Sequence, residues 1–284
     1  MNKIELEKCA CFGVAGNFTG HLEQAGEAFD FKNVKTQELN APKALFPTYL
    51  PNISGSGETP AFLGVFPFDS RTIIFPANEQ KIQIEPECAI IFNAKWKDGK
   101  ILALSPICFG ASNDVSIRKA GAKKISVKKN WGKSSKGLSE NLISLDSFDE
   151  KGILNGYRIA SFMVRGDENV FEYGENSAIR DYSYIYGKLE NWLVEKFNAQ
   201  KDEGPAENIN SYLKESGFPE KIMVSVGATR YTAFGEQNFL LKGDKSVVVL
   251  YPEEKYSPED IKNLVKKNDF ADSGISALAQ EVVL

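Results

Sequence analysis

Residues 83–92, Gln-Ile-Glu-Pro-Glu-Cys-Ala-Ile-Ile-Phe, carry two acidic side chains directly before an apolar run. The run at residues 89–92 predicts a buried strand. Side chains two positions apart in a strand share one face, separated by two rises of ~3.3 Å, so Glu85 and Glu87 are expected side by side. Because like charges at this spacing raise each other's pKa, the pair favours a divalent cation as its partner. The alternative is an exposed edge strand with two solvated acids, which Pro86 would suit.

Other segments predict a β-rich chain with a few helices. Short apolar runs at residues 11–15, 101–104, 222–226 and 247–251 are separated by Gly, Pro and Asn, as is typical of strands. Apolar residues recur at three- and four-residue steps over residues 178–199, which predicts a helix. The motif Ser257-Pro-Glu-Asp260 predicts the start of another helix, with proline in its first turn.

The sequence suggests three segments within one structural domain. Residues 1–60 form an N-terminal segment that ends in a linker-like stretch, Asn52-Ile-Ser-Gly-Ser-Gly-Glu-Thr-Pro60. Residues 61–252 are expected to form the β-rich catalytic core, and residues 253–284 a helical C-terminal extension.

Composition narrows the class of protein. The chain has 284 residues, 42% hydrophobic and 25% charged, with a formal net charge of −4. These values are ordinary for a globular protein and argue against a chain that coats nucleic acid. Since no apolar run reaches about 18 residues and the N-terminus does not resemble a secretory signal, we expect a cytoplasmic protein without a membrane partner. The four cysteines form no C-x-x-C pair and are expected to be reduced thiols.

Three further features carry possible chemistry. His21, the single histidine, follows the strand-like residues 11–15, and strand ends often carry functional groups. Asp114 follows the apolar run near residue 110 and can complete a three-carboxylate site with the two glutamates. Residues 118–136 contain eight basic residues and no acid. With Trp131 as the single aromatic residue of this stretch, attraction of an anionic substrate is favoured over nucleic-acid binding.

Six motifs then occur in order along residues 11–251. They are Asn17-Phe-Thr-Gly-His21, Glu85-Pro-Glu87, Asn113-Asp114-Val-Ser116-Ile-Arg118, Gly132-Lys133-Ser134, Gly227-Ala-Thr229 and Phe239-Leu-Leu-Lys-Gly243-Asp244. Together they resemble the fumarylacetoacetate hydrolase superfamily, as a divergent member. The resemblance implies an α+β, β-rich fold with a mixed β-roll core and a few peripheral helices.

The resemblance also implies a site and an activity. A divalent cation, Mg²⁺ or Mn²⁺ with Ca²⁺ as a further candidate, would be held by the two glutamates and Asp114. Lys133 would face the developing oxyanion, and Arg118 and Thr229 would bind substrate. His21, on a mobile lid helix, would activate water. The implied enzyme cleaves a carbon–carbon bond in a small 1,3-dicarbonyl or acylpyruvate-like oxo acid through an enolate and forms a homodimer.

Two departures from the family pattern leave alternatives open. Gln24 stands where a glutamate would orient the histidine, so Glu23, Glu27 or Glu236 is left to supply the negative charge; we assign Glu23 to the catalytic set. The segment Gly227-Ala-Thr229 also differs from the family's usual Gly-Thr-Pro, which affects the substrate contact assigned to Thr229. A β-keto acid decarboxylase (oxaloacetate-like), or a catalytically silent metal- or ligand-binding member, are the alternative functions.

Overall fold

The acidic segment of residues 85–87 lies at the start of the longest hairpin of the fold. The computed structural model describes residues 3–31, 34, 36, 38, 40–78, 81–119, 121–166 and 169–284. Strands β5 (Pro86–Lys97) and β6 (Lys100–Asn113) pair antiparallel along their whole length. Asp98 and Gly99 at the turn have positive φ angles of 51° and 73°, which suit the two-residue turns that match strand twist.

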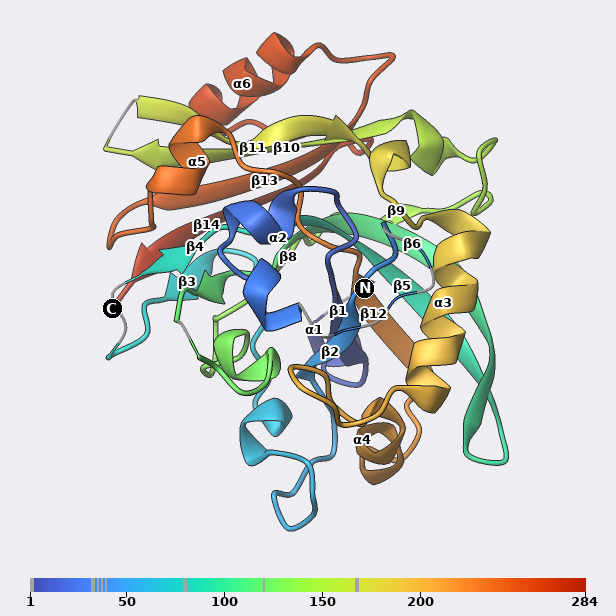
Figure 1. The fold of residues 1–284 in the computed structure, drawn as a ribbon. Helices are drawn as coiled ribbons and strands as arrows, with labels where there is room; N and C mark the ends of the chain where they lie inside the picture. The colour runs from blue at the N-terminus through green and yellow to red at the C-terminus, as the bar shows by residue number, and fades with distance from the viewer. Residues whose placement is uncertain are drawn as a thin grey trace.

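Two mixed sheets and a small ribbon form the β-rich body (Figure 1). The seven-stranded sheet contains β2 (Ala44–Tyr49), β1 (Ala10–Ala15), β12 (Lys221–Ser225), β5, β6, β8 (Gly137–Leu138) and β9 (Ile143–Ser144). The five-stranded sheet contains β11 (Asn169–Ala178), β10 (Tyr157–Arg165), β13 (Lys245–Pro252), β14 (Ser276–Val283) and β3 (Thr72–Ile74). Strands β4 (Ile82–Gln83) and β7 (Ser116–Ile117) form the ribbon. The pairs β1–β12 and β14–β3 are parallel and the other pairs are antiparallel.

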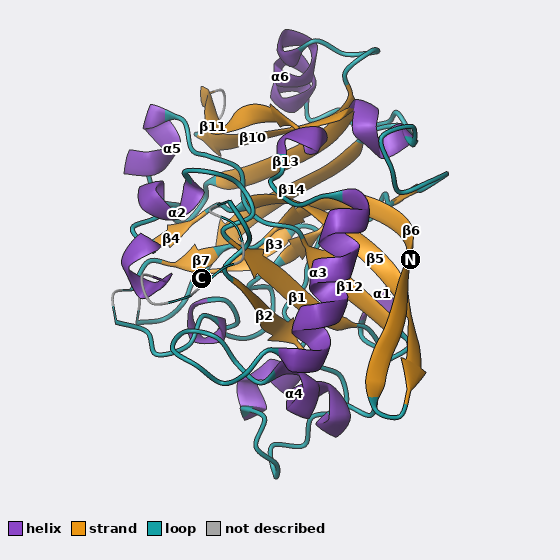
Figure 2. Cartoon of the chain, turned by 45° about the vertical axis from the view of Figure 1, so that its right-hand side comes forward, coloured by secondary structure: helices purple, strands orange, loops and turns teal. Residues whose placement is uncertain are grey.

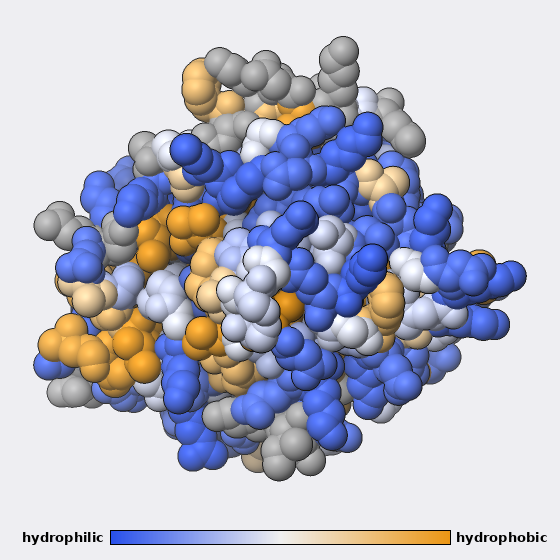
Figure 3. All heavy atoms as spheres, turned by 90° about the horizontal axis from the view of Figure 1, so that it is seen from below, coloured by the Kyte–Doolittle hydropathy of each residue, from blue (hydrophilic) through white to orange (hydrophobic). Residues whose placement is uncertain are grey.

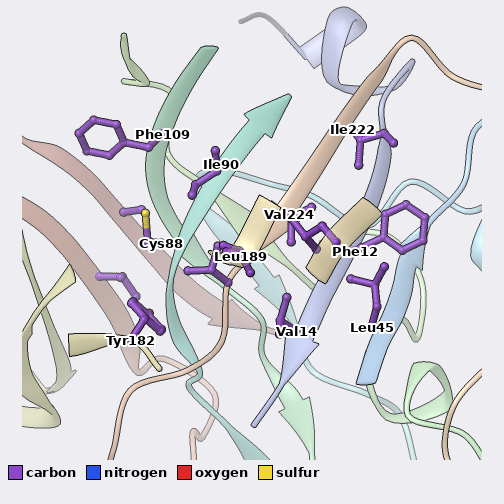
Figure 4. Close-up of a cluster of buried hydrophobic side chains, with 14 of the residues drawn as sticks. Phe12, Val14, Leu45, Cys88, Ile90, Phe109, Tyr182, Leu189, Ile222 and Val224 are labelled. Carbon is purple, nitrogen blue, oxygen red and sulfur yellow. The ribbon is translucent and has the colours of Figure 1, made fainter. Parts of the chain in front are cut away.

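The main core lies between the two sheets. Phe12, Ile90 and Val224 point from the first sheet into one buried cluster, shown in Figure 4. Val248 and Leu278 join the cluster from the second sheet. All five apolar runs predicted as strands therefore form strands of these sheets, and apolar burial between the layers stabilises their pairing.

Short helices surround the sheets (Figure 2). The α-helices are α1 (Lys3–Leu6), α2 (His21–Gln24), α3 (Tyr186–Ala199), α4 (Ile209–Glu215), α5 (Ala233–Gln237) and α6 (Pro258–Lys267). The 3₁₀ turns are η1 (Ala28–Phe31), η2 (Ala61–Gly64), η3 (Ser126–Lys128), η4 (Ile153–Gly156) and η5 (Ile179–Asp181). Helix α6 begins with the predicted capping box of Ser257 and Asp260. Its residues Ile261 and Val265 pack against Val249 and Tyr251.

The helix predicted over residues 178–199 is shorter than expected, because it begins at Tyr186 after the turn η5. The buried side chain of Asn17 accepts a hydrogen bond from the Tyr184 amide at 2.8 Å and donates one to the Tyr184 carbonyl at 2.9 Å. Ser183 donates its amide to the Asn17 carbonyl at 2.9 Å. These contacts use backbone groups that a continuous helix would pair internally, and periodicity could not reveal them.

The C-terminal segment is more than the predicted helical extension. It contains α6, but also β14, which lies between β13 and β3 in the five-stranded sheet. Likewise β1, within the N-terminal segment 1–60, lies between β2 and β12. Both terminal segments thus contribute strands to the sheets that flank the core.

The surface and the thiols are consistent with the composition. Hydrophilic side chains predominate on the face shown in Figure 3, and apolar side chains gather toward its left edge. The four cysteines are free thiols, as predicted, and burial raises the pKa of Cys88. Within the residues that the structure describes, no helix has the length and apolarity to cross a membrane.

Candidate metal centre and active site

The three predicted acidic ligands converge in the interior. Glu85 directly precedes β5, Glu87 lies in β5, and Asp114 directly follows β6. The pairing of Pro86 with Asn113 aligns the start of one strand with the end of the other. All three acids are buried, and one oxygen from each lies within 4.8 Å of the others.

The alternative of an exposed edge strand is therefore wrong. Strand β5 has neighbours on both sides, β12 and β6. Pro86 is tolerated because it is the first residue of the strand, where a missing backbone donor does little harm.

Asn113, the last residue of β6, stabilises the start of β5 and the acids beside it. Its side chain accepts a hydrogen bond from the Glu85 amide at 3.2 Å. The same side chain donates to Ser246 Oγ at 2.9 Å and to Gln280 Oε1 at 3.1 Å. Ser246 and Gln280 belong to β13 and β14, so the second sheet helps to position the acidic cluster.

Basic side chains enclose the carboxylates. Lys129 Nζ lies 2.5 Å from Glu85 Oε2 and 2.7 Å from Asp114 Oδ2. Lys136 Nζ lies 2.8 Å from Asp114 Oδ1, and Arg118 lies 2.8 Å from Glu85 Oε1. The cluster therefore balances buried acids with buried cations, which is the condition for holding charge inside a protein.

The pKa values of the acids are pushed apart. Burial by itself would raise the pKa of Glu85, but the attraction of Lys129 and Arg118 holds it well below its usual value. Burial and the charge of Asp114 raise the pKa of Glu87 well above its usual value. Carboxyl groups with opposite shifts are typical of functional sites.

Lys133 is not part of this cluster. It lies in an exposed turn, whereas Lys129 and Lys136 contact the carboxylates. Phe46 supports Lys129, whose Nζ lies 5.1 Å from the ring centre. A side chain at Gly13 would come within 2.3 Å of that ring, so the glycine makes room for it. The run of eight basic residues indicated lysines near the site but not which of them turn inward.

His21 is buried beside the cluster on α2, which lies near α5 and β4 in both Figure 1 and Figure 2. Its Nδ1 lies 2.8 Å from the carbonyl oxygen of Thr229. Because a carbonyl can only accept, Nδ1 carries the hydrogen and Nε2 is left as a proton acceptor. Burial, with a contribution from Arg118, lowers the pKa of His21 despite the opposing field of Glu85. The neutral form is the one that can act as a base.

Gln24, at the position where the family pattern has a glutamate, binds the backbone of Tyr231. Its side chain donates to the Tyr231 carbonyl at 3.1 Å and accepts from the Tyr231 amide at 2.8 Å. Together with the bond from His21 to Thr229, these contacts hold α2 against residues 229–231.

Of the three acids that could have assisted His21, only one reaches the cluster. Glu23 and Glu236 are exposed, whereas Glu27 is buried between Arg118 and Lys128, at 2.9 Å and 2.8 Å. The carbonyl of Thr229, not a carboxylate, is the partner found for Nδ1. The catalytic role of Glu23 and the substrate contact of the Thr229 side chain stay predictions.

The residues present fit a divalent cation. Glu85 Oε1 and both oxygens of Asp114 are buried, and their contacts are ion pairs of 2.7–2.8 Å with Arg118, Lys129 and Lys136. Carboxylate oxygens are the ligands that Mg²⁺ and Mn²⁺ prefer. The ammonium of Lys129, placed between two of the three acids, would compete with such an ion.

A buried carboxyl behind η3 leads to a prediction about pH. Burial raises the pKa of Glu207 from 4.5 to about 7; one of its oxygens accepts from Ser126 at 2.6 Å, and the other has no partner in the described chain. The folded state thus holds a proton that the unfolded chain loses above about pH 4.5. We expect the free energy of unfolding to fall by roughly 3 kcal/mol between pH 4.5 and pH 8 through this group.

Urea unfolding of Glu207→Gln at both pH values tests this. The variant should match the wild type near pH 4.5 and exceed it at pH 8. Glu203→Gln, which removes an exposed acid of the same loop, should follow the wild type at both. Equal pH dependence in the wild type and Glu207→Gln would contradict the prediction.

Comparison with known proteins gives a family and a fold. Residues 27–282 match the sequence model of a family described as a family of unknown function, DUF5718. No curated protein matches the sequence.

Solved structures share the fold at low sequence identity. Cg1458 with inhibitor has a TM-score of 0.57 at 14% identity, over 96% of this chain and 76% of that chain. A 2-keto-3-deoxy-D-arabinonate dehydratase complexed with magnesium and 2,5-dioxopentanoate has a TM-score of 0.53 at 14% identity, over 99% and 80%. A 2-hydroxyhepta-2,4-diene-1,7-dioate isomerase from Mycobacterium marinum has a TM-score of 0.51 at 13% identity, over 96% and 74%. The predicted fold class is confirmed, because such neighbours are enzymes of the fumarylacetoacetate hydrolase superfamily.

Proposed function

Because the chain belongs to DUF5718, a family described without an activity, we propose its function from the site: a divalent-metal-dependent enzyme that acts on a small oxo acid. In finer terms, the enzyme hydrolyses a carbon–carbon bond of a 1,3-dicarbonyl acid of the acylpyruvate type. The observation that carries the proposal is the convergence of three buried carboxylates, with one oxygen of each within 4.8 Å of the others. The magnesium in the dehydratase of similar fold supports the choice of Mg²⁺, with Mn²⁺ and Ca²⁺ as further candidates.

The acids would hold the ion, and the chain's own residues would handle protons and charge. When bound at Glu85, Glu87 and Asp114, a divalent cation supplies Lewis-acid stabilisation of negative charge developing on the substrate's oxo oxygens. Lys129 adds a fixed positive charge beside the same region. Arg118, with its planar fork of donors, is suited to bind a substrate carboxylate.

His21 would activate water. Its Nε2 takes a proton from water while the water oxygen attacks the distal carbonyl carbon. The carbon–carbon bond then breaks, its electron pair remains on the methylene carbon, and that carbon gains a proton. The products are a carboxylate and a 2-oxo acid. The closed position of α2, with His21 bound to Thr229 and Gln24 bound to Tyr231, would exclude bulk water.

Decarboxylation of a β-keto acid such as oxaloacetate is the second candidate. It is favoured by the partner of His21, which is a carbonyl and not a carboxylate, so the histidine lacks the support that a charged neighbour would give to a strong base. Loss of carbon dioxide needs stabilisation of the enolate but no base that activates water.

His21→Ala separates the two reactions. If His21 activates water, we expect acylpyruvate hydrolysis to fall on the order of 10²- to 10⁴-fold, since general base catalysis contributes that much. Decarboxylation of oxaloacetate by the same variant should change little. The measurement is initial rate with each substrate at saturating Mg²⁺ or Mn²⁺, with binding of the same ions as a check on the site. An unchanged hydrolysis rate would remove His21 from the mechanism.

The remaining expectations belong to the same proposal. The partner is a small anionic oxo acid, and the enzyme acts in the cytoplasm as a homodimer, without nucleic acid or membrane. The single aromatic residue of the basic stretch 118–136, together with the net charge of −4, supports an anionic small molecule over nucleic acid as the partner of these side chains.

A further inference from the structure

Glu27 is a carboxylate of the chain held inside a basic site. It follows Gly26, whose φ of 71° turns the chain directly after α2. Although it comes from a short surface segment, Glu27 is only 8% exposed. Its Oε1 lies 2.9 Å from Arg118 and 2.8 Å from Lys128. A single carboxylate oxygen thus receives two cations, an arrangement that would equally suit a carboxylate from outside.

Arg118 connects this site to the acidic cluster. Its guanidinium contacts Gln83 at 2.5 Å, Tyr231 at 2.7 Å and Glu85 at 2.8 Å, in addition to Glu27. The first three partners are at most 3% exposed and lie in or beside the strands of the core. Glu27 comes from the segment between α2 and η1, so it is the partner that can move away without disturbing a strand.

Two consecutive lysines contact acids on opposite sides of Arg118. Lys129 turns toward Glu85 and Asp114, whereas Lys128 turns toward Glu27. The end of η3 thus supplies one ammonium group to the acidic cluster and another to the site of Glu27. An oxo acid with a second anionic group could meet both sites at once.

A cavity opens at the site of Glu27. Its volume is about 500 Å³, and its lining includes Glu27, Phe29, Arg118 and Lys128. Its position gives an anion in solution access to the two cations that Glu27 holds. The exposed ring of Phe29 at the rim offers an apolar surface beside them.

We propose that Arg118 and Lys128 form a second anion site, which binds a distal carboxylate of the substrate and which Glu27 occupies in the ligand-free protein. This assignment rests on the proposed function and narrows its substrate to oxo acids with two carboxylates. Glu27 acts as an internal competitor: the incoming carboxylate takes its place on Arg118 and releases the segment after α2.

Binding of malonate to the metal-free protein tests the site without turnover. By titration calorimetry, Glu27→Gln should bind malonate at least about tenfold more tightly than the wild type, because its neutral amide competes poorly for two cations. Lys128→Met in the Glu27→Gln background should abolish the gain. Glu38→Gln removes an acid that pairs with Lys188 on the surface, and should bind malonate like the wild type. Unchanged or weaker binding by Glu27→Gln would overturn the proposal.

A second measurement uses the wild type and so does not depend on the folding of a variant. Saturating malonate should increase amide hydrogen exchange in residues 25–29, because Glu27 leaves its site. Unchanged or slower exchange there would contradict displacement. Inorganic phosphate is the comparison: tighter binding of phosphate than of malonate would overturn the assignment to a carboxylate. Neither measurement involves metal or turnover, so a failed activity assay and a failed anion site remain distinguishable.

Discussion

Asp114→Asn is expected to abolish binding of Mg²⁺ and Mn²⁺ at the acidic cluster and to lower turnover on the order of 10³-fold or more. Asparagine keeps the shape of the side chain but removes the charge and one of the acceptors that face the other acids. It also leaves Lys129 and Lys136 with less negative charge beside them. Saturating metal should raise the midpoint of thermal unfolding of the wild type by several degrees, since ligand at about 100 times its Kd adds ~2.7 kcal/mol. This shift should vanish in the variant.

A matched control separates loss of metal from loss of stability. Asp244 is also buried, and pairs with Arg165 through two contacts of 2.9 Å and 2.7 Å outside the acidic cluster. Asp244→Asn should lower the midpoint of unfolding yet keep the shift caused by metal. If Asp114→Asn also kept that shift, the proposed metal centre would be wrong. If the wild type bound metal but neither acylpyruvate nor oxaloacetate turned over, the chain would be a metal-binding member without these activities.

The strands and the convergence of the three acids could be predicted from the sequence because their signals are local. The apolar run after Glu87 identified β5, and the two-residue spacing placed the glutamates together. The position of Asp114 after a second apolar run predicts its place in the cluster. Pairing of β5 with β6 then brings it beside Glu85, which requires only that two neighbouring strands form a hairpin.

Other features depend on contacts between distant residues. The late start of α3 results from hydrogen bonds between Asn17 and Tyr184, which lie 167 positions apart. Gln280 accepts a hydrogen bond from Asn113 behind the acidic cluster, and it can do so because it lies in β14. The prediction of a helical C-terminal extension did not include this strand. No periodicity in the sequence reports such contacts.

The lysines that face the acidic cluster also depend on contacts between distant residues. The basic run 118–136 predicts a positively charged region, whereas the role of Lys133 is implied only by its resemblance to a family motif. Which lysines face inward depends on η3 and on the space that Gly13 leaves for Phe46, beneath Lys129. A side chain's direction in an irregular loop is set by tertiary packing, so charge composition alone could not separate Lys129 from Lys133.

Lys129→Met should strengthen Mg²⁺ binding at least about tenfold while reducing stability without metal. The ammonium of Lys129 lies 2.5 Å from Glu85 and 2.7 Å from Asp114, and so shares two ligands with the proposed ion. Although burial would by itself lower the pKa of Lys129, the attraction of Asp114 and Glu85 raises it, so the lysine is charged. Removing one member of a buried ion pair costs about 3–5 kcal/mol, because a carboxylate is left unpaired. A divalent cation can then supply the missing positive charge.

The expected result is therefore a larger shift of unfolding midpoint with Mg²⁺ in the variant than in the wild type, and a lower Kd by calorimetry. Turnover should fall, because the fixed charge beside the developing oxyanion is lost. Lys128→Met is the matched control: it removes the same charge one position earlier, where the side chain contacts Glu27, and should leave the Mg²⁺ affinity within about threefold. Weaker Mg²⁺ binding by Lys129→Met would mean that the ammonium supports the acids when metal is bound. If Lys129 competes with the ion, the variant binds Mg²⁺ more tightly; if Lys129 supports the metal-loaded site, the variant binds Mg²⁺ more weakly. One titration therefore distinguishes the two roles, although Lys129 lies between the same two carboxylates in both.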